Sequence, residues 1–321
     1  MIRYIGKRLL QMVPILIVVA ILIFSLMSLV PGDPVQIMLG DNATPEQILE
    51  TRASLGLDQP FLTRLGSYLL GILHLDFGNS YMQGTAVGAE LLARFPKTLT
   101  LAFFSIIFTI VIGIPIGIQC AINANKISDK VWMFLTMLGN SMPGFWLALL
   151  LVILFSVKLG WLPSSGDSGL KYFILPVIAN SIGSLADIAR QTRSSMLEVI
   201  RSDYVVTARS KGLAEKDVIW KHALPNALIP IITVCGSRFG FMLGGTVIIE
   251  SVFSIAGIGT YLVNGINSRD YPIVQGSIIY IAFIFAFIML LTDLIYAYVD
   301  PRIKAQYVSV DSKPKKEAAA G

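Results

Sequence analysis

Charged residues are scarce in this sequence. Only 14% of its 321 residues are Asp, Glu, Lys or Arg, whereas 55% are hydrophobic, and the mean hydropathy is +0.71. Such a composition leaves too little polar surface for a soluble domain of this size, and it indicates a polytopic membrane protein. The net charge of +5 predicts no nucleic-acid partner, because the basic residues are segregated by loop and reflect orientation in the membrane.

Side chains that bind metals or carry covalent chemistry are also few. Cys120 and Cys235 both lie in apolar runs, where packed thiols are commoner than a disulfide or a metal pair. His74 and His222 are far apart, so we predict no metal site. The sequence also shows no convergent set of acid and base residues, so we do not predict an enzyme. The phosphate-binding pattern G-x-x-x-x-G-K-[ST] is absent. We therefore expect energy for any transport to come from a partner.

Long apolar runs are what the sequence has in abundance. A helix needs about 20 residues to cross the hydrocarbon core, and the six runs close to that length are Leu9–Val30, Leu99–Ile122, Val131–Val157, Tyr172–Ala189, Ala227–Ile249 and Ile278–Val299. They predict an all-α polytopic membrane protein with six transmembrane helices, because β-barrel strands would alternate over about 10 residues. The first run is too long for a signal peptide and lacks a small-residue cleavage site, so we expect a retained span.

Lys and Arg residues are distributed unevenly between these runs. With the N-terminus inside, 17 of the 25 lie in inside segments and 7 in outside segments, while Arg238 lies within a span. By the positive-inside rule, this bias places both termini and residues 203–225 in the cytoplasm.

This topology divides the chain into four sections: 1–30 with the first span, an external helical segment at 31–98, a five-helix core at 99–299 with a cytoplasmic loop at 190–226, and a cytoplasmic tail at 300–321. The polar tail is expected to be disordered. In the external segment, Thr44, Pro45 and Gln47 predict the capped start of a helix that Gly56 ends. An apolar stripe after Pro60 predicts a second helix, which either packs on neighbouring spans or lies on the membrane surface.

Helix-breaking residues occur at membrane depth. Segments 140–144 and 113–117 each contain proline and glycine, which permit a kink or local unwinding. Such breaks are typical of a translocation path, although static bundles also contain them. After the fifth span, the short glycine-rich piece at 250–259 predicts a re-entrant or interfacial segment near the outer mouth. Its candidate outer-gate residues are Glu250, Phe253, Gly257 and Gly259, with helix capping as the alternative for Glu250.

Arg238 is the one charge in the middle of a predicted span. Leaving it unpaired would cost about 2.5–3.5 kcal/mol on insertion scales, so it must face a partner, water or a pathway. Two interpretations remain open: a contact with a substrate carboxylate, or a permanent ion pair with an acid of another helix. Arg190 and Arg193 follow Asp187 at steps of three, which predicts one charged helix flank. The pathway candidates are Arg238, Asp187, Asp293, Asn140 and Pro143.

The stretch Asp203–Pro225 is polar and basic and lies between two spans. Ser202 or Asp203 is expected to cap a helix that runs to Lys211, and Gly212 fits the C′ position that ends it. An acidic turn at 214–217 predicts the start of a second helix, and Pro225 is expected to end that helix. We interpret the stretch as a helix–turn–helix that contacts something outside the bilayer.

Four residues in this stretch, Ala208, Gly212, Leu224 and Pro225, have a spacing that resembles the EAA motif of ABC importer permeases. In that family, the loop docks into a cleft on a cytoplasmic ATPase. The family glutamate falls at Val206, its first alanine at Thr207 and a later isoleucine at His222, so a glutamate contact cannot be carried over. The matching positions are Ala208, Gly212, Leu224 and Pro225.

Further motifs extend the resemblance over nearly the whole chain. Together they are similar to the permease of the bacterial dipeptide/oligopeptide/nickel ABC importers. In order they are Arg3-Tyr4 through Arg8-Leu9-Leu10, Pro31-Gly32-Asp33-Pro34, Leu57-Asp58-Gln59-Pro60, Gly160-Trp161-Leu162-Pro163, Arg193-Ser194-Ser195-Met196, Val252-Phe253 with Gly257-Ile258-Gly259, Arg269-Asp270-Tyr271-Pro272, and Asp300-Pro301-Arg302.

The resemblance implies a type I ABC importer permease fold in a bacterial inner membrane. It implies a second homologous permease subunit, two ATP-binding subunits and an external substrate-binding protein as partners, besides membrane lipid. ATP and magnesium would bind the partner subunits, with no cofactor on this chain. Di- or oligopeptides are the expected substrates, with nickel, a metal chelate or glutathione as alternatives; few mid-span acids argue against a secondary transporter. The expected ATPase-coupling residues are Asp203, Thr207, Ala208, Arg209, Lys211, Gly212, Leu213, Leu224 and Pro225.

Overall fold

The computed structural model describes residues 2–40 and 42–299, and within these ranges the chain forms helices and no strand. In chain order, the α-helices are α1 (Ile2–Leu29), α2 (Pro34–Leu39), α3 (Pro45–Ser54), α4 (Phe61–Leu73), α5 (Val87–Ile122), α6 (Ile127–Ser141), α7 (Gly144–Leu151), α8 (Ile174–Ile200), α9 (Asp203–Ser210), α10 (Glu215–Asp217), α11 (Leu224–Gly245), α12 (Val247–Phe253), α13 (Ile258–Asn267) and α14 (Tyr271–Val299). Two π-helical segments, Val152–Lys158 and Val218–Ala223, and a 3₁₀ turn, Leu170–Phe173, complete the secondary structure.

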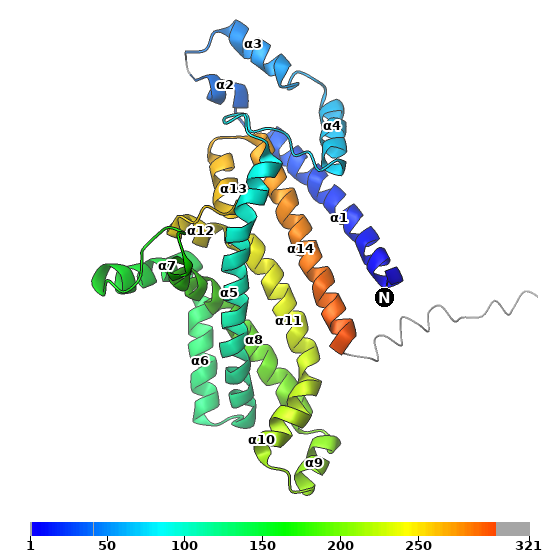
Figure 1. The fold of residues 1–321 in the computed structure, drawn as a ribbon, viewed down its shortest axis with the longest axis vertical. Helices are drawn as coiled ribbons and strands as arrows, with labels where there is room; N and C mark the ends of the chain where they lie inside the picture. Colours follow the sequence, from blue (N-terminus) through cyan, green and yellow to red (C-terminus); the bar gives the residue numbers. More distant parts are fainter. Residues whose placement is uncertain (1, 41, 300–321) are drawn as a thin grey trace, which may run out of the picture.

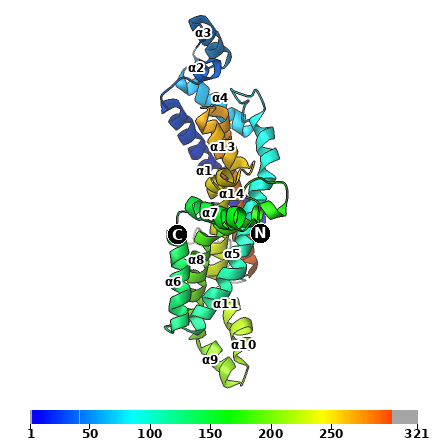
Figure 2. The same ribbon diagram turned by 90° about the vertical axis from the view of Figure 1, so that its left-hand side faces the viewer.

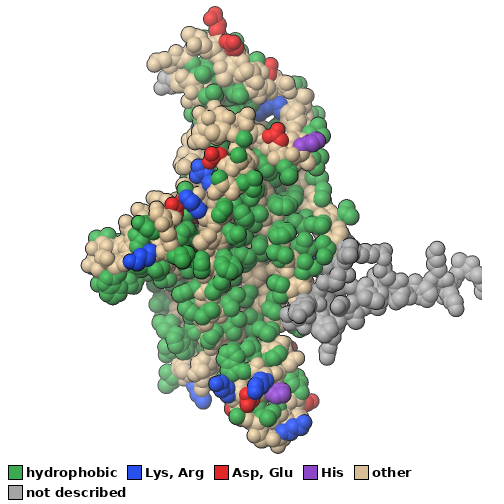
Figure 3. All heavy atoms as spheres, viewed as in Figure 1, with side chains coloured by type: hydrophobic (Ala, Val, Ile, Leu, Met, Phe, Trp, Pro, Cys, Tyr) green, Lys and Arg blue, Asp and Glu red, His purple; other side chains and the backbone are tan. Residues whose placement is uncertain are grey.

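Five stretches are long and apolar enough to cross a membrane, and they match five of the six predicted runs. They are Arg8–Leu29, Val87–Ile122, Leu170–Ile200, Glu215–Gly244 and Tyr271–Ile295. These helices form an elongated bundle, with α2–α4 at one end and α9–α10 at the other (Figures 1 and 2). An apolar zone covers the middle of the face in Figure 3, between charged side chains above and below it. The all-α polytopic architecture predicted from the sequence is confirmed.

Two further membrane-compatible pairs are sharply bent. The third predicted run falls on α6 and the segment Gly144–Lys158, which meet at 99°, and the predicted re-entrant piece falls on α12 and α13, which meet at 88°. The first break lies at Met142 and Pro143, between the end of α6 and the start of α7. Proline at this depth therefore breaks the span rather than bending it slightly.

The predicted loop at 190–226 is largely helical, and helix α8 extends into its first part. Helix α8 continues from the fourth apolar run to Ile200, because its inner half packs Thr192 and Met196 into the interior in spite of the charges around them. Helical structure resumes at Asp203 with α9 and again at Glu215 with α10. The irregular part of the loop is thus short, and α8 connects directly to the hairpin.

Pro225 does not end a helix, contrary to the prediction. The helical stretch runs from Glu215 to Gly244 without a sharp bend. Pro225 lies in the first turn of α11, directly after the π-helical segment, where a missing backbone N–H is tolerated. The change of helix type at this junction lets the chain pass the proline.

The glycines in the segment 113–117 serve close packing rather than a break. Helix α5 is continuous through Pro115. A Cβ at Gly117 would lie 2.6 Å from the carbonyl oxygen of Ala189 and 2.5 Å from Cβ of Thr192. These small residues let α5 and α8 approach closely, as in other membrane helix pairs.

The external segment starts as predicted. Thr44 and Gln47 form a capping box at the start of α3, and Gly56 follows the helix with a φ of +65°. The apolar stripe of α4 packs partly on α1, with the Tyr68 and Phe24 rings stacked at 5.3 Å between centroids. The tail at 300–321, which was expected to be disordered, lies outside the described residues.

Two distant motifs meet at this end of the molecule. The Arg269 guanidinium lies against Gly32, whose φ is +113° and whose missing Cβ leaves the space for it. Asp270 is fully buried at the start of α14 and accepts hydrogen bonds from Ser80 Oγ at 2.6 Å and Met82 N at 3.1 Å. These contacts tie the external segment to the bundle.

Candidate functional site

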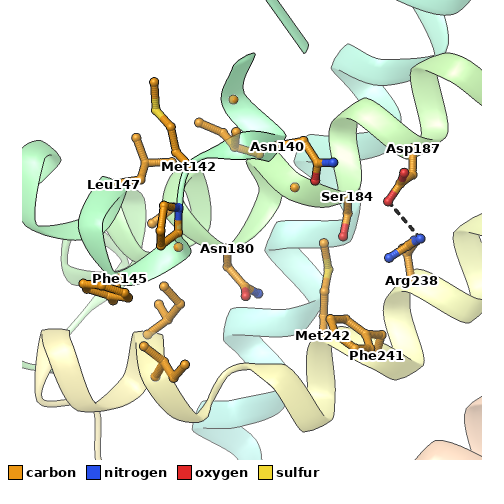
Figure 4. A pocket seen from close by; sticks show the side chains of 18 residues that line it. Asn140, Met142, Phe145, Leu147, Asn180, Ser184, Asp187, Arg238, Phe241 and Met242 are labelled. Atoms are coloured by element: carbon orange, nitrogen blue, oxygen red, sulfur yellow. Dashed lines mark ion pairs between the residues drawn. The ribbon is translucent and has the colours of Figure 1, made fainter. Parts of the chain in front are cut away.

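A cavity of about 510 Å³ lies where the broken span meets α8 and α11. The α6–α7 break supplies Asn140 and Pro143, α8 supplies Asp187, and α11 supplies Arg238. Four of the five predicted pathway residues therefore share one cavity (Figure 4). Its volume is within the range of small-molecule sites, about 300–1,000 Å³. The start of α12 closes part of the wall through Ile248 and Ile249.

Arg238 and Asp187 form an ion pair on the wall of this cavity. The distance from Arg238 Nη2 to Asp187 Oδ2 is 2.8 Å, and the side chains are 36% and 22% exposed. Arg190 Nη2 lies 3.9 Å from the other Asp187 oxygen. Arg238 thus forms an ion pair with another helix and also faces a cavity. This geometry is compatible with both interpretations of Arg238, as a partner of a structural acid and as a contact for a substrate.

Asp293, the fifth pathway candidate, lies away from this cavity. It forms a 3.0 Å ion pair with Arg8 on α1. The two residues line a second, mostly apolar cavity between α1 and α14. Asp293 therefore joins the first helix to the last and is absent from the wall of the first cavity.

Arg193 belongs to a separate ion pair that the sequence analysis missed. Its Nε and Nη2 donate to the two oxygens of Asp129 at 2.8 and 2.7 Å, and Asn125 N donates to the same carboxylate at 2.9 Å. The Asp129 side chain is only 4% exposed. This pair holds the α5–α6 turn on α8. Asp129 lies in the first turn of α6, between two lysines, and this position was the only feature of the sequence that could have indicated the pair.

The predicted outer-gate residues gather at the corner between α12 and α13. Glu250 is fully buried, and its carboxylate accepts hydrogen bonds from Thr98 Oγ1 at 2.8 Å, Thr246 Oγ1 at 3.1 Å and Thr260 N at 3.1 Å. A Cβ at Gly257 would lie 2.4 Å from Glu250 Oε2. The carboxylate thus caps the N-terminus of the next helix, α13, rather than its own.

The rest of the corner explains the other two gate candidates. Phe253 is buried beside the α5 and α8 core, and a Cβ at Gly259 would lie 2.5 Å from the Val247 backbone. Thr98 on α5, which the sequence analysis missed, also accepts a hydrogen bond from Ile258 N at 2.9 Å. Glu250, Phe253, Gly257 and Gly259 are therefore brought together as one packed corner.

A surface ion pair anchors this corner to the preceding loop. Asp167 Oδ2 accepts hydrogen bonds from Lys97 Nζ at 2.6 Å and from Ala256 N at 3.1 Å. The Lys97 hydrogen bond, more than the opposing effect of burial, holds the pKa of Asp167 below its ordinary value. Gly166 N also donates to the Phe253 carbonyl at 2.8 Å.

At the other end of the bundle, α9 and α10 form the predicted helix–turn–helix. Ser202 occupies the N-cap position of α9, which starts at Asp203. Gly212 has a φ of +76°, and its amide donates to the Arg209 carbonyl at 2.9 Å. The predicted C′ geometry of Gly212 is confirmed. Arg209 donates to both oxygens of Glu215, at 3.1 and 2.8 Å, and so staples the two helices together.

The predicted coupling residues divide between the inside and the outside of this hairpin. Ala208 is buried with Val205 in the core that the hairpin shares with α8 and α11, and Leu224 packs against that core. The exposed positions from the prediction are Asp203, Thr207, Lys211, Gly212, Leu213 and Pro225. Large apolar side chains, which the analysis overlooked, are also 45–50% exposed here: Tyr204, Val206 and Trp220.

Comparison with protein families gives two adjoining matches. Residues 113–305 match the binding-protein-dependent transport system inner membrane component family, and residues 1–102 match the N-terminal part of the corresponding membrane component. Together the two matches cover most of the chain.

Several characterised or named proteins are similar over nearly their whole length. A putative peptide transport system permease protein of Brucella abortus (strain 2308) is 43% identical over 306 residues, which are 93% of this chain and 98% of that protein. A dipeptide transport system permease protein of Alkalihalophilus pseudofirmus is 40% identical over 332 residues, covering 95% and 100%. A glutathione transport system permease protein of Salmonella choleraesuis is 40% identical over 304 residues, covering 95% and 99%.

One group of solved structures shares the fold. An inward-facing structure of the MetNI methionine ABC transporter aligns with a TM-score of 0.57 at 20% identity, covering 65% of this chain and 96% of the matched chain. At this identity the likeness concerns the helical architecture alone.

Proposed function

Because this chain belongs to the family of binding-protein-dependent transport inner membrane components, the permeases of ABC importers, we propose that it forms half of a peptide translocation pathway. The other half comes from a second, homologous permease subunit. Two ATP-binding subunits supply the energy, and an external binding protein delivers the substrate. ATP and magnesium bind those ATP-binding subunits, and this chain carries no cofactor of its own.

One observation carries the mechanism: the two helices that bear the charged wall of the cavity are the two that continue into the hairpin. Asp187 lies on α8 and Arg238 on α11. Helix α8 leads into α9, and α10 leads through the π-helical segment into α11. A rigid-body displacement of the hairpin therefore acts on both helices at once and alters the cavity.

The exposed surface of the hairpin supports docking on an ATP-binding subunit. Four large apolar side chains of the hairpin, Tyr204, Val206, Leu213 and Trp220, are between 41% and 50% exposed, and apolar surface of this kind is used for contacts between proteins. The same hairpin exposes basic side chains, including Lys211 and Lys216. A partner cleft with an apolar floor and an acidic rim would complement this surface. Arg209 contributes indirectly, through Glu215, by fixing the angle between α9 and α10.

Peptides are the proposed cargo. The relatives named as peptide and dipeptide transport permeases support this cargo, and the cavity offers both a cationic and an anionic side chain. Glutathione is the second candidate, because a relative of similar identity carries that name. Nickel or a metal chelate is the remaining candidate.

The proposed location is a bacterial inner membrane with both termini in the cytoplasm. The 17 to 7 distribution of basic residues supports this orientation. The external segment α2–α4 and the hairpin α9–α10 occupy opposite ends of the bundle (Figures 1 and 2). This arrangement agrees with an external segment on one side of the membrane and a coupling hairpin on the other.

The test is uptake by the complete transporter in proteoliposomes. We expect ATP-dependent accumulation of the dipeptide alanyl-phenylalanine that requires the binding protein and persists when proton and sodium gradients are dissipated. Preferential uptake of glutathione would support the second candidate. Accumulation by this chain alone, without ATP-binding subunits, would refute the proposal.

A further inference from the structure

The cavity between α6, α8 and α11 has a balanced charge. Asp187 is the one acid and Arg238 the one base among the described residues that line it. A ligand with a single charge would pair with one of them and leave the other unpaired inside the bundle, which is unfavourable. A ligand with one positive and one negative group would satisfy both.

The Arg238–Asp187 pair has fewer hydrogen bonds and is more exposed than the other ion pair of α8, so its partners can be exchanged more easily. Arg193 makes two hydrogen bonds to Asp129, whose side chain is 4% exposed and receives a further backbone hydrogen bond from Asn125. Arg238 is held by a 2.8 Å contact to one carboxylate oxygen, and its side chain is 36% exposed. A guanidinium has five N–H donors, so Arg238 retains donors for a ligand.

The polar groups beside the pair are suited to a peptide bond. Asn140, Asn180 and Ser184 point into the same space from α6 and α8 (Figure 4). An asparagine amide has two N–H donors and an acceptor oxygen, which match the two groups of a peptide unit. Asn180 uses one of its N–H groups on Ser105 Oγ at 3.1 Å and keeps the second N–H and the oxygen. The remaining wall is apolar and includes Met142 and Met242, and methionine adapts to differently shaped side chains.

We propose that the Arg238–Asp187 pair is an exchange site for zwitterionic peptides: during passage the terminal carboxylate of the peptide accepts hydrogen bonds from Arg238, and its terminal ammonium donates to Asp187. The asparagines hold the peptide backbone between these ends. The two side chains pair with each other again when the ligand leaves, so the empty pathway carries no unpaired charge. This inference rests on the proposed peptide transport and adds the specificity for two free, oppositely charged ends.

The first experiment measures uptake of alanyl-phenylalanine by the complete transporter carrying Arg238→Gln, Asp187→Asn or both. If the pair were only structural, the double variant would leave no unpaired charge on the cavity wall, because Arg190, the other basic neighbour of Asp187, is 55% exposed to solvent. It would then recover the uptake that the single variants lose. We expect instead that the double variant stays at least tenfold below the unchanged transporter while co-purifying with its partners. Recovery of uptake in the double variant would overturn the proposal.

The Asp129–Arg193 pair provides the matched control on the same helix. There, Arg193→Gln and Asp129→Asn are expected to reduce co-purification of the complex, and the double variant is expected to recover part of it. This opposite pattern would show that the assay distinguishes a structural pair from an exchange site.

The second experiment reads binding without transport. Cys120 and Cys235 are replaced by Ala, Phe145→Cys is introduced in the cavity wall, and labelling by a maleimide is followed in the purified complex. Alanyl-phenylalanine should slow the labelling, whereas its N-acetylated and C-amidated forms should not. Equal protection by all three overturns the proposal. If the unchanged transporter accumulates no dipeptide, the proposed cargo is wrong, and this labelling still decides whether the site recognises zwitterions.

Discussion

At the scale of single residues, Gly212 has the most specific backbone requirement in the hairpin. Its φ of +76° belongs to the left-handed region, and a Cβ there would meet no atom within 4 Å. The need for glycine is therefore conformational rather than steric. A side chain branched at Cβ disfavours this region, by roughly 1–2 kcal/mol.

We predict that Gly212→Val reduces the ratio of native to non-native hairpin by about 5- to 30-fold and lowers uptake, while the protein remains in the membrane. Co-purification of the ATP-binding subunits and dipeptide uptake measure the effect. Gly212→Asn is the matched control, because asparagine tolerates positive φ, and it should retain most of the activity. Unchanged uptake in the valine variant would contradict the proposed coupling role.

Asp167 gives a prediction on pH. Its hydrogen bond with Lys97 lowers the pKa of the carboxyl group in the folded protein, so the contact stabilises the fold above the ordinary aspartate pKa of about 3.9. This contribution is lost as the pH falls through the lowered pKa. We expect the Ala256 amide, which donates to Asp167, to lose protection from hydrogen exchange in that acidic range, after correction for the intrinsic rate. In Asp167→Asn the protection should be weak at neutral pH already.

At the scale of elements, the corner between α12 and α13 depends on one buried carboxylate. Glu250 receives hydrogen bonds from side chains of α5 and of the residue before α12, and from the backbone of α13. Ser254, between the two helices, has a φ of +53°, so the turn is tight. The 88° bend is thus held by polar contacts as well as by the packing of Phe253.

Replacing Glu250 by Ala should lower the thermal unfolding midpoint of the purified complex. Each buried donor left without an acceptor costs about 1–3 kcal/mol, and Thr98 Oγ1, Thr246 Oγ1 and Thr260 N all lose theirs. Glu250→Gln keeps one acceptor oxygen and should cause a smaller decrease. If the alanine variant unfolded at the same temperature as the unchanged complex, the corner would not depend on this carboxylate.

At the scale of the whole molecule, two polar assemblies are separated by the apolar bundle. The external segment α2–α4 is tied to α13–α14 through Asp270 and Arg269, whereas the hairpin α9–α10 packs on the far ends of α5, α8 and α11. The Arg8–Asp293 ion pair joins α1 to α14, the first and the last of the described helices. A displacement of the hairpin would therefore act first on α8 and α11, which line the cavity.

This arrangement predicts opposite accessibility for two exposed serines. In a background with Cys120 and Cys235 replaced by Ala, Ser54→Cys on α3 should react with a membrane-impermeant maleimide in intact spheroplasts. Ser210→Cys on α9 should react only in inverted vesicles or permeabilised cells. Labelling of the Ser210 position from the outside would exclude docking on a cytoplasmic ATP-binding subunit.

The sequence by itself determined whatever depends on local chemistry or on composition. Apolar length located five of the spans, and proline and glycine located the breaks near Pro143 and after Glu250. Side-chain capping predicted the start of α3 at Thr44, and a need for positive φ predicted Gly212. These features follow from residues within a few positions of one another, and the ordered motifs that indicate the family are likewise visible in one dimension.

Only the tertiary structure decided the contacts between helices. The sequence placed both Asp187 and Asp293 among the pathway candidates, and the packing paired Asp187 with Arg238 and Asp293 with Arg8. Glu250 caps a helix that is not its own, and Pro225 lies inside a helical stretch because a π-helical turn precedes it. Each outcome depends on which helices are neighbours and at what rotation. A periodic apolar sequence leaves this rotation open, because many faces are almost equally hydrophobic.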